Sequence, residues 1–182
     1  FDLAQAEAKL VGEIVGRYGR SPNPAIVRAI KNWPAIYTLK QLQEFLGTMN
    51  YIRPHCGPEY ARVSAPLKAL LKVGAQFPPN EEQEKAIEKL KDLAIEMHQL
   101  CVPDEAAAIL AANAWLNGCP PAGRPYECGA DTSGYAIGGV CGQCDKENGK
   151  LMPLLYITAH LQDHQVYWHS SEQELWGLLN VK

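Results

Sequence analysis

The sequence has no long hydrophobic run, and this absence excludes the simplest way of crossing a membrane. No stretch of apolar residues approaches the roughly 18 that a membrane-spanning helix needs. The first residues also lack the basic segment followed by an apolar segment that marks a secretory signal peptide. We therefore expect a soluble protein with no membrane partner and an intracellular location, either cytoplasmic or nuclear, with an organellar assembly left open.

Cysteine is also sparse, with six residues in a chain of 182. This number is too low for a small secreted scaffold held together by disulfides, so we expect most cysteines to be small buried side chains in a reducing compartment. Cys141 and Cys144 form a Cys-x-x-Cys pattern inside a predicted strand. Residues three apart on a strand point to opposite faces, so these two are not expected to share a metal ion or a disulfide.

The net charge of the chain is small, at −3, but its two parts differ in sign. Residues 1–75 contain ten Lys and Arg against five Asp and Glu, a formal charge of +5, whereas residues 76–182 contain seven against fifteen, a formal charge of −8. This asymmetry favours a protein that binds a polyanion with its first part and metal ions with its second. Ordinary variation in surface charge is the alternative interpretation.

Helix signals dominate the first two thirds of the chain. Thr38 with Gln41 forms a capping box, and Asn80 precedes an acidic helix start. The predicted elements are a short amphipathic lead-in at 3–9, a hairpin at 10–19, and helices that begin after Ser21 or Asn23, at Thr38, at Tyr60, at Asn80 and after Pro103, the last closed by Gly118. In the Thr38 helix the expected buried stripe comprises Leu39, Leu42, Phe45, Leu46, Met49 and Ile52.

The last third of the chain predicts an antiparallel meander followed by a helix. Strands are expected at 126–130, 136–144 and 151–158, the last two joined by an Asn-Gly turn, and a helix begins at Ser170 or Ser171. The fold class is therefore α+β. Asp131 ends the first strand, and an acid in that position is either a solvated loop residue or a catalytic carboxylate.

Two groups of motifs match one known family in order along the chain. The first group comprises Val11-Gly12, PAIVRAI at 24–30 with Trp33-Pro34, FLG at 45–47 with Asn50-Tyr51 and Arg53, and Ala65-Pro66-Leu67 with Leu70 and Lys72. The second group comprises ADTSGYAIGGVCGQ at 130–143 and the segment MPLLYITAHLQDHQVYWHSSEQELWGLL at 152–179. Together they resemble reverse transcriptases of Ty3/gypsy-type LTR retrotransposons, from the thumb region through the first half of ribonuclease H.

The resemblance implies a domain organisation and a chemistry. It places the end of the palm with a primer-grip-like hairpin at 1–20, a thumb-like helical module at 21–76, a helical connection with an inserted helix at 77–125, and the first half of a ribonuclease H-like domain at 126–182. It implies that Asp131 and Glu174 are catalytic and bind Mg²⁺ in a two-ion site that is only partly present. Clustered carboxylates suit such a site for phosphodiester cleavage. Glu172 is expected instead to be either a capping or a solvated residue.

The same resemblance implies that the partner is an RNA–DNA hybrid or a primer–template. Candidate phosphate contacts on the helices are Lys40, Arg53, Arg62, Lys68 and Lys72, although part of this set is expected only to solvate helix surfaces. His160, His164 and His169 are expected in a surface loop, and the helix containing Trp115 is expected to pack.

Departures from the family pattern leave the function open between two hypotheses. The palm aspartates and the last two acids of ribonuclease H are not among these residues, which suggests a piece of a longer polypeptide. One hypothesis is a fragment of an active reverse transcriptase with ribonuclease H. The alternative is a co-opted, catalytically incomplete remnant that serves as a structural or binding subunit with protein partners in a larger assembly. An unrelated helical adaptor fused to a hairpin domain is the poorest interpretation.

Overall fold

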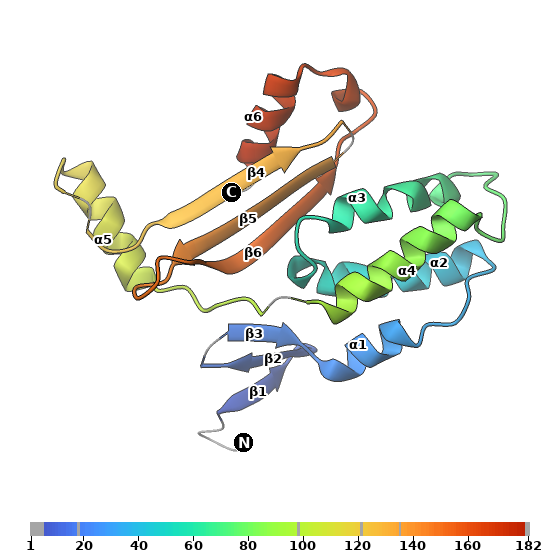
Figure 1. Cartoon of the computed structure of the whole chain (residues 1–182), viewed down its shortest axis with the longest axis horizontal. Coiled ribbons are helices and arrows are strands. Elements are labelled where there is room, and N and C mark those ends of the chain that lie inside the picture. Colours follow the sequence, from blue (N-terminus) through green and yellow to red (C-terminus); the bar gives the residue numbers. More distant parts are fainter. Residues whose placement is uncertain (1–5, 18, 98, 121, 135, 181–182) are drawn as a thin grey trace.

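The computed structural model describes residues 6–17, 19–97, 99–120, 122–134 and 136–180. Two three-stranded antiparallel sheets and a group of helices make up the chain, so the predicted α+β class is confirmed (Figure 1). The first sheet contains β1 (Glu7–Leu10), β2 (Glu13–Gly16) and β3 (Gly19–Pro22). The expected hairpin has two strands, and the sheet has a third because part of the predicted lead-in at 3–9 belongs to β1. Residues 3–5 of that lead-in lie outside the described residues.

Four helices form what we call the helical module, with α1 at Pro24–Lys31, α2 at Leu39–Ile52, α3 at Tyr60–Ser64 and α4 at Glu81–Ile95. Their predicted starts are confirmed. Asn23 caps α1, and capping boxes at Thr38 and Asn80 satisfy backbone N–H groups that the first turns of α2 and α4 leave open. The predicted third helix is instead the short α3 followed by a 3-10 helix at Ala65–Leu71, which has a proline in its first turn.

The hydrophobic core lies inside the helical module. Four members of the predicted α2 stripe are fully buried, whereas Leu46 is partly buried and Leu39 is 39% exposed, so the prediction for Leu39 was wrong. Trp33 packs against Phe45 in an edge-to-face arrangement with ring centroids 5.6 Å apart. The fully buried side chains of this core are Ile30, Leu42, Phe45, Met49, Ile52, Leu67, Leu90 and Ala94.

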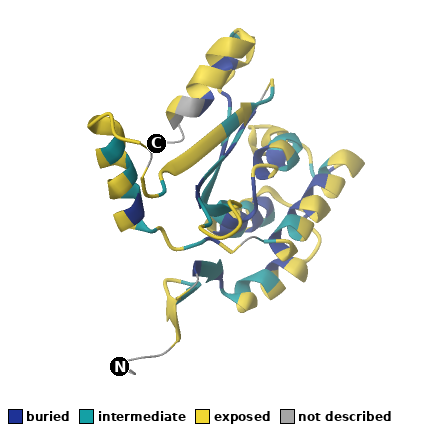
Figure 2. Cartoon of the chain, turned by 60° about the vertical axis from the view of Figure 1, so that its left-hand side comes forward, coloured by how far each residue is buried: buried dark blue, intermediate teal, exposed yellow. Residues whose placement is uncertain are grey.

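The second sheet contains β4 (Tyr126–Thr132), β5 (Ala136–Cys144) and β6 (Leu151–His160), in that order. Helix α6 (Ser170–Asn180) packs on β4 after a 3-10 turn at Gln165–Tyr167. The three predicted strands and the last helix are confirmed within two residues of their expected bounds. One edge of β4 has no neighbouring strand among the described residues, and most of β4 is exposed (Figure 2).

The helical module and the second sheet pack against each other directly. Glycine at position 138 makes this contact possible, because a Cβ atom there would lie only 2.9 Å from Cβ of Pro58. A second link joins the two sheets through Leu100, whose backbone N–H and C=O pair with those of Arg20, while the N–H of Cys101 donates to the carbonyl of Pro153 at 2.7 Å. The chain therefore holds these parts together by backbone contacts between distant segments.

Helix α5 (Glu105–Leu116) stands apart from the other helices, at the far end of the second sheet (Figure 1). The helix was expected to pack, but Trp115 is 81% exposed and Ala107 is the one buried residue of α5 among the described residues. A polar network fixes the start of α5, in which Gln143 accepts from the N–H of Asp104 at 2.7 Å and Arg124 donates to the Asp104 carboxylate. No helix among the described residues is both long and apolar enough to cross a membrane.

The cysteines do not follow the expectation of small buried side chains. Cys128 and Cys141 lie directly opposite each other on β4 and β5 and form a disulfide, and of the four free cysteines only Cys56 is fully buried. Cys128 and Cys141 are placed symmetrically about the loop between the two strands, which is the sequence signal that could have identified the pair. The expectation that Cys141 and Cys144 do not pair with each other is confirmed.

Candidate nuclease half-site and nucleic-acid surface

Asp131 lies near the end of β4, where the strand register fixes the direction of its side chain. It is paired directly with Gly138 on β5, and directly paired residues of an antiparallel sheet point to the same face. Because the space above Gly138 is filled by Pro58, that face is covered by the helical module. The Asp131 side chain is exposed and borders a hollow at this junction.

Glu174 lies on α6, which packs on the other face of β4. The close approach occurs at Gly177, where a Cβ atom would lie 3.1 Å from Cγ2 of Thr132 and 3.6 Å from Cβ of Ala130. Ala130 and Thr132 flank Asp131, so side-chain alternation directs Asp131 away from α6. Glu172 accepts a hydrogen bond from the N–H of His169 at 3.0 Å, so of its two expected roles the structure shows the capping one.

The two candidate carboxylates therefore start from opposite faces of β4. Both are exposed, and β4 has one edge without a partner strand among the described residues. Within the described part of the chain, no group of three or more His, Cys, Asp or Glu side chains is placed to hold a metal ion. Asp131 and Glu174 alone thus do not fit the two-ion Mg²⁺ site that the family resemblance implies.

Three of the predicted phosphate contacts lie near one another on the helical module. Besides burial, the positive charges of Lys68 and Arg53 both help to lower the pKa of His160. Burial also lowers the pKa of Lys68, which Asp163 raises and Lys72 lowers further, so one acid lies close to these bases. Arg62 lies elsewhere, beside the hollow that Asp131 borders. Lys40 is in the first turn of α2 and Arg53 follows its last turn, so the helix separates them by about 20 Å at 1.5 Å per residue.

The tip of the first hairpin is held by the helical module. The hydroxyl of Tyr51 donates to the carbonyl of Val11, and the N–H of Asn23 donates to the carbonyl of Gly12 at 3.0 Å. Glu13 accepts from the fully buried ring of His55 at 2.9 Å and lies 3.6 Å from Arg20. The first hairpin is thus anchored to α2 and to the 3-10 turn at Arg53–His55.

His160 corrects the expectation of a histidine-rich surface loop. It lies at the end of β6 and its Nε2 is 3.2 Å from Oγ of Ser64, while its buried Nδ1 has no hydrogen-bond partner among the described residues. Burial, together with the positive charges of Lys68 and Arg53, lowers the pKa of His160 to about 4. His164 and His169 do lie outside the strands, where His164 packs edge-to-face on Trp168 and His169 precedes α6.

The depressed pKa of His160 predicts an acid-sensitive junction. The unfolded chain takes up the proton near pH 6.5, whereas the folded chain resists it down to about pH 4, so stability falls as the pH decreases between these values. After allowance for partial solvent screening, we expect a loss of about 2 kcal/mol from this residue. Urea unfolding at pH 7 and pH 4.5 measures it. Between pH 7 and pH 4.5, the free energy of unfolding of His160→Gln should fall by about 2 kcal/mol less than that of the unmodified protein. Equal losses in the two proteins would show that His160 is not the cause of the acid sensitivity.

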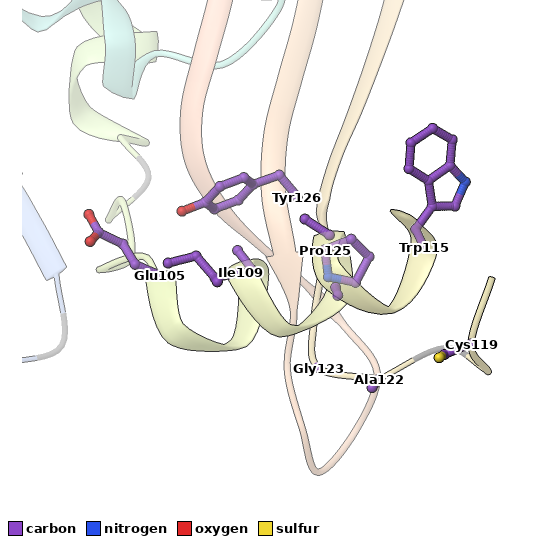
Figure 3. A pocket seen from close by; sticks show the side chains of 11 residues that line it. Glu105, Ile109, Trp115, Cys119, Ala122, Gly123, Pro125 and Tyr126 are labelled. Atoms are coloured by element: carbon purple, nitrogen blue, oxygen red, sulfur yellow. The ribbon is translucent and has the colours of Figure 1, made fainter. Parts of the chain in front are cut away.

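A hollow of about 740 Å³ lies between α5 and the segment that leads into β4. Figure 3 shows Ile109 of α5 near Pro125 and Tyr126, with Trp115 farther along the helix. Most of its lining is apolar, and Glu105 is the only charged residue among the lining residues that the structure describes. Sequence reasoning missed this surface because it treated α5 as a packing helix; the signal was its alanine-rich composition, without a polar face.

Comparison with solved structures shows which fold the chain shares. The structure superposes on the foamy viral protease-reverse transcriptase in complex with RNA/DNA hybrid with a TM-score of 0.75 and 17% sequence identity, over 97% of this chain and 21% of the viral chain. The same viral protein in complex with dsDNA gives a TM-score of 0.74 at 18% identity, over 98% of this chain and 33% of the viral chain. The fold is therefore that of a segment of a reverse transcriptase.

Sequence comparison then gives the family. The chain is 30% identical over 179 residues to the retrovirus-related Pol polyprotein from transposon 297 of Drosophila melanogaster, which covers 98% of this chain and 15% of that protein. Identity is 27% to the Pol polyprotein from transposon opus of the same organism and 24% to the transposon Tf2-3 polyprotein of Schizosaccharomyces pombe, covering 17% and 12% of those proteins. No family model matches the sequence. The chain is thus a homologue of a short segment of retrotransposon Pol polyproteins, as the motifs predicted.

Proposed function

We propose that this chain is the part of a retroelement reverse transcriptase with ribonuclease H that grips an RNA–DNA hybrid or a primer–template. The observation that carries the proposal is the cluster formed by Arg53, Lys68 and Lys72 on the helical module, next to the junction with the second sheet. All three side chains are exposed. A polyanionic duplex lying along this junction would neutralise them and release counterions. The relatives are Pol polyproteins, and a viral protein of the same fold has been solved in complex with RNA/DNA hybrid.

The second sheet would contribute half of a nuclease site. Asp131 and Glu174 are the two acids that match the ribonuclease H pattern. Further acids from another part of the polypeptide would join them at the edge of β4 that has no partner strand among the described residues. Mg²⁺ bound by such a completed set would supply phosphodiester hydrolysis. Two acids are too few for that chemistry. Asp131 and Glu174 would therefore mark where the site lies, and catalysis would need the further acids.

A binding measurement tests the proposal. The association constant of the 182-residue chain for a labelled RNA–DNA hybrid should fall as the salt concentration rises. In a plot of log association constant against log salt concentration, the double variant Arg53→Gln/Lys68→Gln should reduce the slope by about 2. The same variant should bind the hybrid at least about 10-fold more weakly at about 0.1 M salt. Fluorescence anisotropy over a salt series gives both quantities.

The matched control is Lys85→Gln/Lys89→Gln on α4, which makes the same change in charge at two exposed lysines. We expect it to change affinity less than about threefold, because only long-range attraction is lost. Equal losses in the two double variants, or no salt dependence in the unmodified chain, would overturn the proposal.

The alternative function, a binding or scaffold subunit, is favoured by one surface. Helix α5 exposes Ile109, Leu110, Trp115 and Leu116, each by more than half. Large exposed apolar side chains gathered on one helix are typical of protein contact sites. This surface lies away from the basic cluster, so a protein partner there is compatible with a nucleic acid at the junction.

A further inference from the structure

One side of helix α5 carries a mainly apolar stripe, which we call the α5 face. Its members recur at steps of three and four residues, so they lie on one side of the helix. They are Glu105, Ala108, Ile109, Ala112, Trp115 and Leu116. All of them except Leu116 line the hollow of about 740 Å³ beside α5, which Pro125 and Tyr126 also line (Figure 3). The α5 face thus forms one wall of this hollow.

Another side of α5 is fixed to the rest of the chain. The N–H of Arg124 donates to the carbonyl of Ala107 at 2.9 Å, and a Cβ atom at Gly123 would lie only 2.1 Å from the same oxygen. Asp104 caps the helix by accepting from the N–H of Ala107 at 3.0 Å. In the α5 face itself, every residue except Ala108 is exposed. A firmly held helix therefore presents an uncovered apolar surface, whereas helices that are apolar on all sides are normally buried.

The order of large and small side chains along the α5 face fits a second copy of the same face. When two α5 helices pack antiparallel about a two-fold axis at Ala112, residues at equal distances before and after Ala112 lie opposite each other. Ile109 of one copy then faces Trp115 of the other, and Ala108 faces Leu116. The small side chain of Ala112 at the axis lets the two helices approach closely.

Charge favours the antiparallel arrangement of the two helices. A parallel pair would place the Glu105 carboxylates of the two copies side by side, and α5 has no basic residue in its last turn to relieve them. In the antiparallel pair with Ala112 at the axis, the two Glu105 residues are about 21 Å apart along the helices, at 1.5 Å per residue. That separation exceeds the screening length of about 8–10 Å at moderate salt, so the two carboxylates do not repel each other appreciably.

The available area sets the strength of such a pairing. A standard interface buries about 800 Å² on each partner. Aromatic side chains bury about 150–250 Å² each, so the exposed parts of Trp115 and Tyr126 together supply about 300 Å². Ile109 and Leu116, which are 60% and 71% exposed, and the alanines of the stripe add to this area. The total lies at the small end of stable interfaces, which is typical of a weak and reversible dimer.

We propose that the α5 face and the hollow beside it form the interface of a weak symmetric dimer of this chain, with the two α5 helices antiparallel and Ala112 at the two-fold axis. We expect a dissociation constant on the order of 10–100 µM. This inference does not depend on the binding of a hybrid, because the α5 face lies away from the basic cluster at Arg53, Lys68 and Lys72.

Sedimentation equilibrium of the 182-residue chain tests the dimer. Between about 1 and 200 µM the average mass should rise from 20.1 kDa towards twice that value. Ile109→Ser should weaken the dimer at least about 10-fold, because each dimer contains two contacts between Ile109 and Trp115. The matched control is Leu110→Ser, since Leu110 is 58% exposed but lies outside the lining of the hollow. We expect it to change the dissociation constant by less than about twofold.

Cysteine substitution tests the position of the axis, in a Cys119→Ser background because Cys119 is exposed and free. Ala112→Cys places two thiols at the axis, where oxidised glutathione should convert them to a disulfide between the copies and be reduced to two thiols. Ala106→Cys makes the same change at an exposed residue of α5 outside the α5 face, and its two copies would be about 18 Å apart along the helices. We expect covalent dimer on a non-reducing gel to form at least about 10-fold faster with Ala112→Cys.

Three results would overturn the inference. The first is a mass of 20.1 kDa at every concentration, and binding of an apolar dye in the hollow of that monomer would assign the surface to another occupant. The second is an equal effect of Ile109→Ser and Leu110→Ser, and the third is equal cross-linking through residues 106 and 112. Hybrid affinity of Ile109→Ser, measured below the dimer dissociation constant, should stay within about twofold, so failure of the dimer leaves the proposed function intact.

Discussion

Replacing Asp131 by Asn is expected to abolish hybrid cleavage in a polypeptide that joins this chain to the two further acids of ribonuclease H. The Asn amide has the shape of the Asp carboxylate but not its charge. When several acids act together in catalysis, replacing any one of them removes most of the catalytic activity. We expect a fall in the cleavage rate of at least about 10³-fold. Gel analysis of a labelled RNA strand annealed to DNA measures it, with hybrid affinity measured in parallel.

The matched control is Glu127→Gln, four residues earlier on β4. Glu127 and Asp131 point to the same face of the strand, and both are exposed. Because Glu127 matches no acid of the ribonuclease H pattern, we expect cleavage within about twofold of the unmodified enzyme. Undiminished cleavage by Asp131→Asn would remove Asp131 from the site.

Phe45→Ala is expected to have the largest effect on stability. The ring is fully buried, packs edge-to-face on Trp33 and stands at the centre of the core of the helical module. Removing the ring leaves a cavity, and the surrounding helices can move into it only partly because each also packs against other elements. We therefore expect a loss of about 4 kcal/mol in the free energy of unfolding. Urea denaturation followed by circular dichroism gives this value.

Leu39→Ala provides the comparison on the same helix. The heptad-like spacing places Leu39 in the same stripe as Phe45, yet its side chain is 39% exposed. We expect a loss below about 1 kcal/mol, since little apolar area returns to water. A loss as large as that of Phe45→Ala would contradict the observed packing of α2.

Local signals explain which parts of the fold could be predicted from the sequence. The capping boxes at Thr38–Gln41 and Asn80–Gln83 involve residues three apart, so their hydrogen bonds can be inferred without knowledge of the tertiary structure. The strand bounds followed from glycine and Asn-Gly turns in the same way. The position of Asp131 on its strand belongs to this predictable class.

Contacts between distant segments explain what could not be predicted. The hydrogen bond of His160 with Ser64 spans two modules, and the fit of Pro58 against Gly138 depends on how those modules pack. The sequence placed Asp131 and Glu174 in one site, but only strand alternation in the folded sheet assigns them to opposite faces of β4. The helix containing Trp115 was expected to pack, and its sequence carries no local signal that Trp115 is exposed.

The paired backbone groups of Arg20 and Leu100 have a consequence for the order in which the protein folds. Gly19 leaves no room for a side chain at this contact, since a Cβ atom would lie 2.1 Å from the carbonyl oxygen of Leu100. Contacts of large sequence separation form late, because the intervening chain must first be ordered. During synthesis the bridge from the first sheet to the second therefore cannot form until residue 100 has left the ribosome, whereas the pairing of β1, β2 and β3 needs only residues 7–22.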